Sequence, residues 1–106
     1  MVNQQTQEAI KAFTVERDWG QFHSTANLAK SISIEAGELL ECFQWSDDAD
    51  PRRVAAELAD ILTYCVLLAD RLGVDLDEIV LDKLRESAAK YPVDTARGKS
   101  AKYDAL

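Results

Sequence analysis

Residues 35–60 read EAGELLECFQWSDDADPRRVAAELAD, a run in which a polar turn separates two acidic helical patterns. Eight of these residues are acidic and two are basic. The turn ends at Asp50-Pro51, where Asp50 is suited to cap a helix and Pro51 to occupy its first position. The run therefore predicts two helices that fold back on each other around residues 48 and 49.

Apolar residues at helical spacing extend the pattern in both directions. One helix is expected at residues 24–45 and the next at residues 51–72, where Gly73 is suited to a left-handed cap. Their expected core positions are Leu28, Ile32, Leu39 and Phe43 in the first, and Val54, Leu58, Ile61, Cys65, Leu68 and Leu72 in the second.

Two further helices flank this pair. The first is expected at residues 3–18, with Asn3 as its N-cap and a break at residues 19–23. The last is expected at residues 75–90, where Asp75 and Glu78 suggest a capping arrangement. With 106 residues, the chain is expected to form one all-α domain over residues 1–106, resembling a four-helix bundle, with residues 93–106 as a polar tail.

Composition argues against several classes of protein, including nucleic acid binders and membrane-spanning proteins. A net charge of -7 argues against a nucleic acid polymer, because such proteins use clustered Lys and Arg to bind phosphates. The longest uncharged apolar segment, residues 61–69, is far too short to span a membrane, and residues 1–11 lack a secretory pattern. Cys42 and Cys65 have no neighbouring cysteine for zinc or redox chemistry and are expected to be buried free thiols. We expect a cytoplasmic protein.

The acidic residues take equivalent positions on the two central helices. At about 100° per residue, Glu35 lies against the apolar stripe of its helix and Glu38 lies about 60° to its side. Glu57 and Asp60 stand in the same relation to the stripe of the next helix. Glu38 and Glu41 come about as many residues before the turn as Glu57 and Asp60 come after it, so the two pairs stand at matching heights in the fold-back. Four carboxylates are therefore expected to converge beside the core.

Converging carboxylates repel one another and lose hydration, a cost that a divalent cation would relieve. Oxygen ligands suit Mg²⁺, or Mn²⁺ as a substitute, and such a site fits phosphate ester or anhydride chemistry. A di-iron site would need Glu-x-x-His pairs, whereas the single histidine, His23, lies in neither acidic helix. An ordinary solvated acidic face is the alternative interpretation.

Glu35-x-x-Glu38 followed by Glu57-x-x-Asp60 resembles the paired acidic motif of the MazG-like all-α nucleoside triphosphate pyrophosphohydrolases. Residues 13–106 further resemble the dCTP pyrophosphatase branch of that family. The matching segments include Arg17-Asp18-Trp19-x-Gln21-Phe22-His23, Glu41-x-Phe43-Gln44-Trp45, Glu57-Leu58-x-Asp60-Ile61-Leu62-x-Tyr64, Tyr91-Pro92 and Lys102-Tyr103.

The resemblance implies Mg²⁺-dependent hydrolysis of a nucleoside triphosphate to the monophosphate and pyrophosphate, through attack of metal-activated water at the α-phosphorus. It assigns Glu35, Glu38, Glu57 and Asp60 as catalytic metal ligands. Many family members carry a glutamate before the first ligand, where this chain has Ile34, so a water-orienting acid at that position is in doubt. Glu41 is the candidate to replace it.

The resemblance also implies a nucleobase pocket, for which Trp19 and Trp45 offer flat stacking faces. Its expected substrate-binding residues are Trp19, Gly20, Gln21, Phe22, His23, Trp45, Tyr64 and Lys83. Arg97 and Lys102 are further phosphate-binding candidates. The implied assembly is a homo-oligomer, expected to be a tetramer built as a dimer of dimers, in which the basic tail could reach a neighbour's acidic site. A noncatalytic helical module that binds cations or a protein partner is the alternative.

Overall fold

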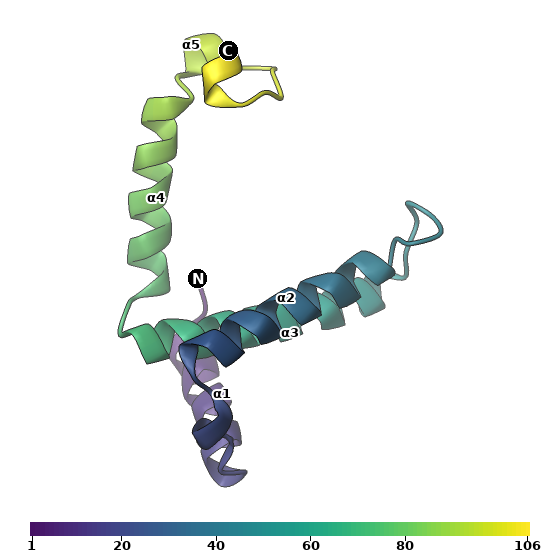
Figure 1. The fold of residues 1–106 in the computed structure, drawn as a ribbon, viewed down its shortest axis with the longest axis vertical. Helices are drawn as coiled ribbons and strands as arrows, with labels where there is room; N and C mark the ends of the chain where they lie inside the picture. Colours follow the sequence, from purple (N-terminus) through teal and green to yellow (C-terminus); the bar gives the residue numbers. More distant parts are fainter. The chain divides into compact units, whose positions relative to one another are not determined.

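A computed structural model describes residues 1–106, and its regular structure is entirely helical (Figure 1). The chain divides into two compact units, Met1–Val74 and Asp75–Leu106. The first unit contains α1 (Gln4–Glu16), η1 (Trp19–Phe22), α2 (Thr25–Glu41) and α3 (Pro51–Leu72). The second contains α4 (Leu76–Lys90), α5 (Val93–Ala96) and η2 (Tyr103–Ala105). The all-helical class is confirmed, and a single domain over residues 1–106 stays a prediction.

The predicted fold-back is present, because α2 and α3 pack side by side as an α-helical hairpin (Figure 1). The start and end of α3 agree with the sequence prediction: the Asp50 side chain accepts a hydrogen bond from the Arg52 N–H at 3.0 Å, and Gly73 ends the helix with φ 68°. This φ lies in the left-handed region that favours glycine.

The prediction that the preceding helix continues to residue 45 is wrong, because α2 ends at Glu41. Beyond it the backbone tightens: the Cys42 N–H donates to the Leu39 carbonyl at 3.1 Å, and the Phe43 N–H to the Leu40 carbonyl at 2.9 Å. Such short-range bonds commonly finish a helix. Ser46 then accepts from the Asp48 N–H at 3.0 Å, a local bond that competes with helix continuation.

The helix at the N-terminus also agrees with its predicted start. Asn3 accepts a hydrogen bond from the Thr6 N–H at 2.8 Å and caps α1, which ends two residues before the predicted position. Asp18 takes a left-handed conformation with φ 52°. The expected break at residues 19–23 contains the short helix η1. In Figure 1, α1 runs across the α2–α3 hairpin, and it packs mainly against α3 and η1.

Few side chains of Met1–Val74 are fully buried. Leu28 is 1% exposed, and Cys42, Val66 and Ala69 are also buried. Both cysteines are free thiols, and Cys65 is only partly buried. The prediction that Phe43, Leu58 and Leu72 lie in the core is wrong for this chain, since all three are exposed. This unit supplies only one further α-helix, α1, to cover the hairpin.

The unit Asp75–Leu106 begins as predicted, because Asp75 caps α4 by accepting from the Glu78 N–H at 3.0 Å. Residues 93–106, predicted from the sequence as a polar tail, contain the short helices α5 and η2. The Tyr91 and Tyr103 rings meet edge to face at 6.1 Å, and the Lys90 ammonium lies 5.3 Å from the Tyr103 ring centroid. None of the chain's helices is both long enough and apolar enough to cross a membrane.

Candidate metal centre

The α2–α3 hairpin brings four acidic side chains together. Glu35 and Glu38 are three residues apart on α2, and Glu57 and Asp60 are three apart on α3. One carboxylate oxygen from each of the four residues lies within 4.8 Å of the others. We call this group the carboxylate cluster. Positions three apart share a helix face, which is why each helix supplies two adjacent carboxylates.

Two members of the carboxylate cluster have a buried side-chain oxygen. Glu35 and Glu57 are half-buried, whereas Asp60 is exposed. The Oε2 atom of Glu35 and the Oε2 atom of Glu57 are buried and have no hydrogen-bond partner. An unpartnered buried carboxylate oxygen destabilises the folded chain unless a proton or a cation satisfies it.

Burial and mutual repulsion also raise the pKa values of two carboxyl groups in the carboxylate cluster. Desolvation by burial, followed by hydrogen bonding to and repulsion by Glu38, raises the pKa of Glu35 to about 7. Repulsion by Asp60 and Glu57 acts in the same direction. Desolvation likewise raises the pKa of Glu57, and the nearby positive charge of Arg53 opposes that shift.

The carboxylate cluster fits a hard divalent cation. Its donors are all carboxylate oxygens from four side chains, and two buried oxygens lack any other partner. Mg²⁺ and Mn²⁺ prefer such ligands, whereas zinc sites favour sulfur and nitrogen. The side chains present therefore agree with the metal chemistry expected from the sequence.

A pocket of about 470 Å³ adjoins the carboxylate cluster. Asp60 belongs to both, so the two features are adjacent. The pocket is lined by Thr6, Ala9, Ile10, Phe13 and Thr14 of α1, by Trp19 and His23, and by Asp60, Thr63, Tyr64 and Leu67 of α3. This volume and a mainly apolar, aromatic lining are typical of small-molecule sites. We call it the aromatic pocket.

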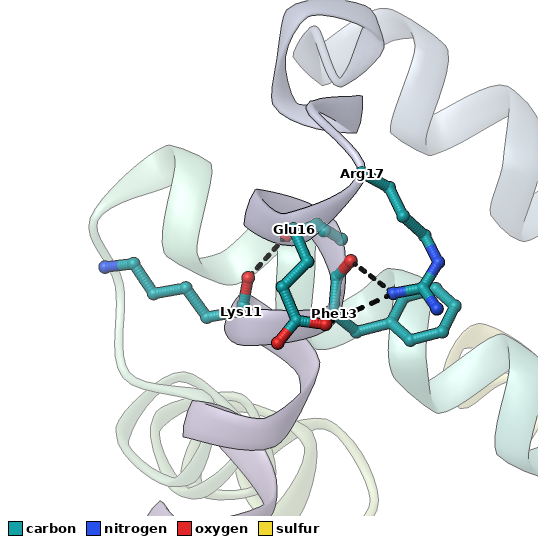
Figure 2. Close-up of polar contacts among 5 residues, drawn as sticks. Lys11, Phe13, Glu16 and Arg17 are labelled. Carbon is teal, nitrogen blue, oxygen red and sulfur yellow. Dashed lines mark hydrogen bonds and ion pairs between the residues drawn. The ribbon is translucent and has the colours of Figure 1, made fainter.

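One wall of the aromatic pocket is held by contacts at the end of α1. The Phe13 and Trp19 rings meet edge to face at 5.5 Å, and the Arg17 guanidinium carbon lies 3.8 Å from the Phe13 ring centroid. Figure 2 shows Arg17 reaching back to donate a hydrogen bond to the Phe13 carbonyl at 3.0 Å, with Glu16 beside it. These contacts hold the Phe13 and Trp19 rings in place in the pocket wall.

Two polar side chains of the aromatic pocket already donate hydrogen bonds to the protein backbone. The Thr14 hydroxyl donates to the Lys11 carbonyl at 2.8 Å, and the Thr63 hydroxyl donates to the Ala59 carbonyl at 2.8 Å. Both hydroxyls therefore keep only acceptor capacity toward a ligand. His23 and Tyr64 supply the pocket's remaining polar side chains beside Thr6 and Asp60.

The structure separates the expected substrate-binding residues into two groups. Trp19, His23 and Tyr64 line the aromatic pocket, whereas Gly20, Gln21 and Phe22 occupy η1 without lining it. Trp45 is 90% exposed in the turn after α2. Lys83 belongs to α4, in the other unit, and pairs with Glu86 at 3.5 Å.

Two other positions weighed from the sequence lie outside the carboxylate cluster. Glu41 is exposed and is not among the converging carboxylates. Ile34, at the position where many family members have an acid, is also exposed. Neither position supplies a fifth ligand.

Sequence reasoning missed the contribution of α1 to the pocket. The residues concerned are Thr6, Ala9, Ile10, Phe13 and Thr14. Their spacing is that of a single helix face, which is the available signal. An apolar helix face predicts packing, however, and does not distinguish packing from a ligand pocket.

Comparison with known proteins places this hairpin in a family. The model of the MazG-like family matches residues 30–106, which include all four acids of the carboxylate cluster. The chain belongs to the MazG-like family. The matched region also spans α3 and the whole of the unit Asp75–Leu106.

Individual MazG-like relatives carry more specific names. The chain is 43% identical to dCTP pyrophosphatase 1 of Rattus norvegicus, over 89% of its own length and 61% of the relative. It is 44% identical to dCTP pyrophosphatase 1 of Homo sapiens, with the same coverage of both chains. The chain thus spans about three fifths of the length of the curated relatives it matches.

A solved structure is similar as well. A pyrophosphatase from Archaeoglobus fulgidus aligns with a TM-score of 0.75 and 34% identity, covering 87% of this chain and 96% of that chain. At this identity and coverage, the two proteins share both a fold and sequence similarity.

Proposed function

We propose that this protein hydrolyses deoxynucleoside triphosphates to the monophosphate and pyrophosphate, with dCTP or a related or modified deoxynucleotide as its substrate. The observation that carries the proposal is the carboxylate cluster, whose member Asp60 also lines the aromatic pocket. A cation site and a base-sized aromatic cavity are thereby joined at one residue. The names of the relatives, dCTP pyrophosphatase 1 and a pyrophosphatase, support this assignment.

Mg²⁺ is the proposed cofactor, with Mn²⁺ as a substitute, held by Glu35, Glu38, Glu57 and Asp60. When bound, such an ion offsets phosphate charge and lowers the pKa of a coordinated water. The protein's own contribution is the fixed spacing of the four carboxylates on two packed helices. Because Glu35 and Glu57 are half-buried, their oxygens are held in place before a ligand arrives.

The aromatic pocket is the proposed site of the nucleobase. Trp19 offers an apolar face, and stacking of a base on an aromatic ring contributes about 1–3 kcal/mol in nucleic acid binders. His23 and Tyr64 are the proposed hydrogen-bonding partners of the base or sugar. Gly20, Gln21 and Phe22 support the pocket by forming η1, in which the Gln21 amide donates to the Asp18 carbonyl at 2.9 Å.

The proposed working form is a homo-oligomer, with a tetramer as the expected state. Large apolar side chains of the first unit, including Ile34, Leu40 and Leu58, are exposed in the single chain, which supports association with further copies. Trp45 and Lys83 are proposed to complete a pocket in the assembly. Removal of modified or excess deoxynucleotides is the proposed purpose, and the cytoplasmic location stays a prediction.

The deciding experiment incubates the protein with each deoxynucleoside triphosphate at equal concentration, with and without Mg²⁺, and measures monophosphate and pyrophosphate. We expect equal amounts of the two products, formed only with the metal and fastest from a cytosine nucleotide. Release of inorganic phosphate instead of pyrophosphate would assign a different phosphohydrolase reaction. Absence of turnover across the panel would favour the noncatalytic cation-binding or interaction module.

A further inference from the structure

One face of α3 presents a basic and an aromatic side chain beside the two acids of the carboxylate cluster. With Glu57 set at zero and about 100° per residue, Tyr64, Arg53 and Asp60 fall at about -20°, -40° and -60°. These four side chains therefore share a narrow stripe along the helix. Their order along that stripe is Arg53, the two carboxylates, and then the aromatic pocket residue Tyr64.

Arg53 is the basic residue on this stripe, and its guanidinium has no salt-bridge partner. Its side chain is exposed and forms no salt bridge, whereas the adjacent Arg52 lies 3.7 Å from the Asp50 carboxylate. Its positive charge acts on the carboxylate cluster, because it opposes the upward shift in the pKa of Glu57. A free guanidinium thus stands next to the proposed metal site.

The aromatic pocket lies on the opposite side of the carboxylate cluster along α3. Its α3 residues, Thr63, Tyr64 and Leu67, follow Asp60 in the chain, whereas Arg53 precedes Glu57 by four residues. Four residues correspond to about 6 Å along a helix axis. A ligand that extends from the pocket across the carboxylates therefore arrives at Arg53.

We propose that Arg53 binds the β- and γ-phosphates of the substrate, so that the nucleotide lies along α3 with its terminal phosphates toward the hairpin turn. This inference rests on the proposed function. The bond that breaks joins the α- and β-phosphates, so the α-phosphate must lie at the carboxylate cluster when the base is in the aromatic pocket. The two outer phosphates then continue away from the pocket. Guanidinium groups bind phosphate oxygens in a bidentate manner, which suits this end of the site.

The test measures binding separately from turnover. Calorimetric titrations with Mg²⁺ use the non-hydrolysable α,β-imido analogue of dCTP and, separately, dCMP, which lacks the outer phosphates. We expect Arg53→Gln to weaken binding of the triphosphate analogue about tenfold or more, as for a lost charged hydrogen bond, and to leave dCMP binding unchanged. The matched control is Arg52→Gln, on the neighbouring residue that pairs with Asp50, which should change neither affinity.

Equal weakening of dCMP and the analogue in Arg53→Gln, or no weakening of either, would overturn the proposed orientation. Circular dichroism and the thermal midpoint establish that the variant is folded, and Arg53→Lys should restore part of the lost affinity. Normal turnover by the wild type together with an unchanged Arg53→Gln would reject the orientation alone. If the wild type binds the analogue but hydrolyses no triphosphate, the proposed function fails while the orientation can still be measured. If it binds no analogue, both proposals fail.

Discussion

Glu35 of α2 and Glu57 of α3 are equivalent across the hairpin, since each directs its Oε2 atom into the protein without a hydrogen-bond partner. Each is followed three residues later by a second acid of the carboxylate cluster. The folded chain therefore concentrates negative charge where solvent is partly excluded. Cation binding should relieve this cost, which makes the stability of the fold depend on divalent metal.

We expect Mg²⁺ and Mn²⁺ to raise the thermal midpoint of the protein. A ligand that binds only the folded state at 100 times its dissociation constant stabilises it by about 2.7 kcal/mol. Calorimetric melting in EDTA and in excess metal measures the shift. Glu35→Gln should reduce it strongly, whereas Glu41→Gln, outside the carboxylate cluster, should retain it. Equal shifts in both variants would mean that the metal binds elsewhere.

The raised pKa of Glu35 predicts a pH dependence of the metal-free protein. Because the folded-state pKa is about 7 and the ordinary value is 4.5, the folded protein holds this proton more tightly than the unfolded chain. Its contribution to the free energy of unfolding is present below pH 4.5 and is lost as the pH rises through about 7. Urea unfolding in EDTA at several pH values measures this loss. The loss should shrink in Glu35→Gln, and an identical pH profile in that variant would contradict the assignment.

Removal of one proposed metal ligand should greatly reduce turnover without unfolding the chain. In Glu38→Gln the side-chain volume is kept and one carboxylate charge is lost, so helicity should change little. We expect hydrolysis of dCTP to fall by about 100-fold or more, because metal-site groups contribute several kcal/mol to the transition state. Product formation and far-ultraviolet circular dichroism are the two measurements. Full activity in this variant would remove Glu38 from the mechanism.

The parts of the fold that could be predicted from the sequence are those set by local chemistry. Asp50, Pro51 and Gly73 mark the ends of α3 through capping and backbone preferences that need no tertiary contact. Glu57 and Asp60 could be placed on one face because helix geometry alone fixes their relation. The apolar pattern predicts an end of α2 that is too late, since the bonds after Glu41 depend on how the turn itself folds.

The aromatic pocket could be predicted only in part. The sequence predicts Trp19, His23 and Tyr64 as ligand contacts, but the α1 residues that line the same pocket, such as Thr14, have the pattern of an ordinary helix face. An apolar stripe predicts that positions such as Leu58 are covered, but it does not identify the partner, and in the single chain Leu58 is exposed. Packing between elements distant in sequence has no local signal.

Trp19 should be a principal determinant of base affinity. We expect Trp19→Ala to raise the KM for dCTP about tenfold, the loss expected for one stacked base, with a smaller effect on kcat. Steady-state kinetics gives both constants. Val15→Ala, which truncates an exposed apolar side chain of α1 that does not line the pocket, is the control and should leave KM unchanged. An unchanged KM in Trp19→Ala would place the base elsewhere.

The C-terminal segment offers a last prediction, because residues 90–106 carry four bases and two acids in an otherwise acidic chain. Arg97, Lys99 and Lys102 form no salt bridge, and the Tyr91–Tyr103 contact folds the segment on itself. We propose that this positive charge favours closure of the segment over a triphosphate bound at the acidic site of a neighbouring copy.

Deletion of residues 93–106 should therefore raise the KM for dCTP several-fold. Deletion also removes Tyr103 and its contact with Tyr91, so a second variant separates charge from folding. The triple variant Arg97→Gln, Lys99→Gln, Lys102→Gln keeps both tyrosines and should reproduce most of the increase, with a weaker dependence of KM on salt than the wild type. A KM that stays the same in both variants would reject a substrate role for the segment. An increase confined to the deletion would instead assign the segment to folding through its tyrosine contact.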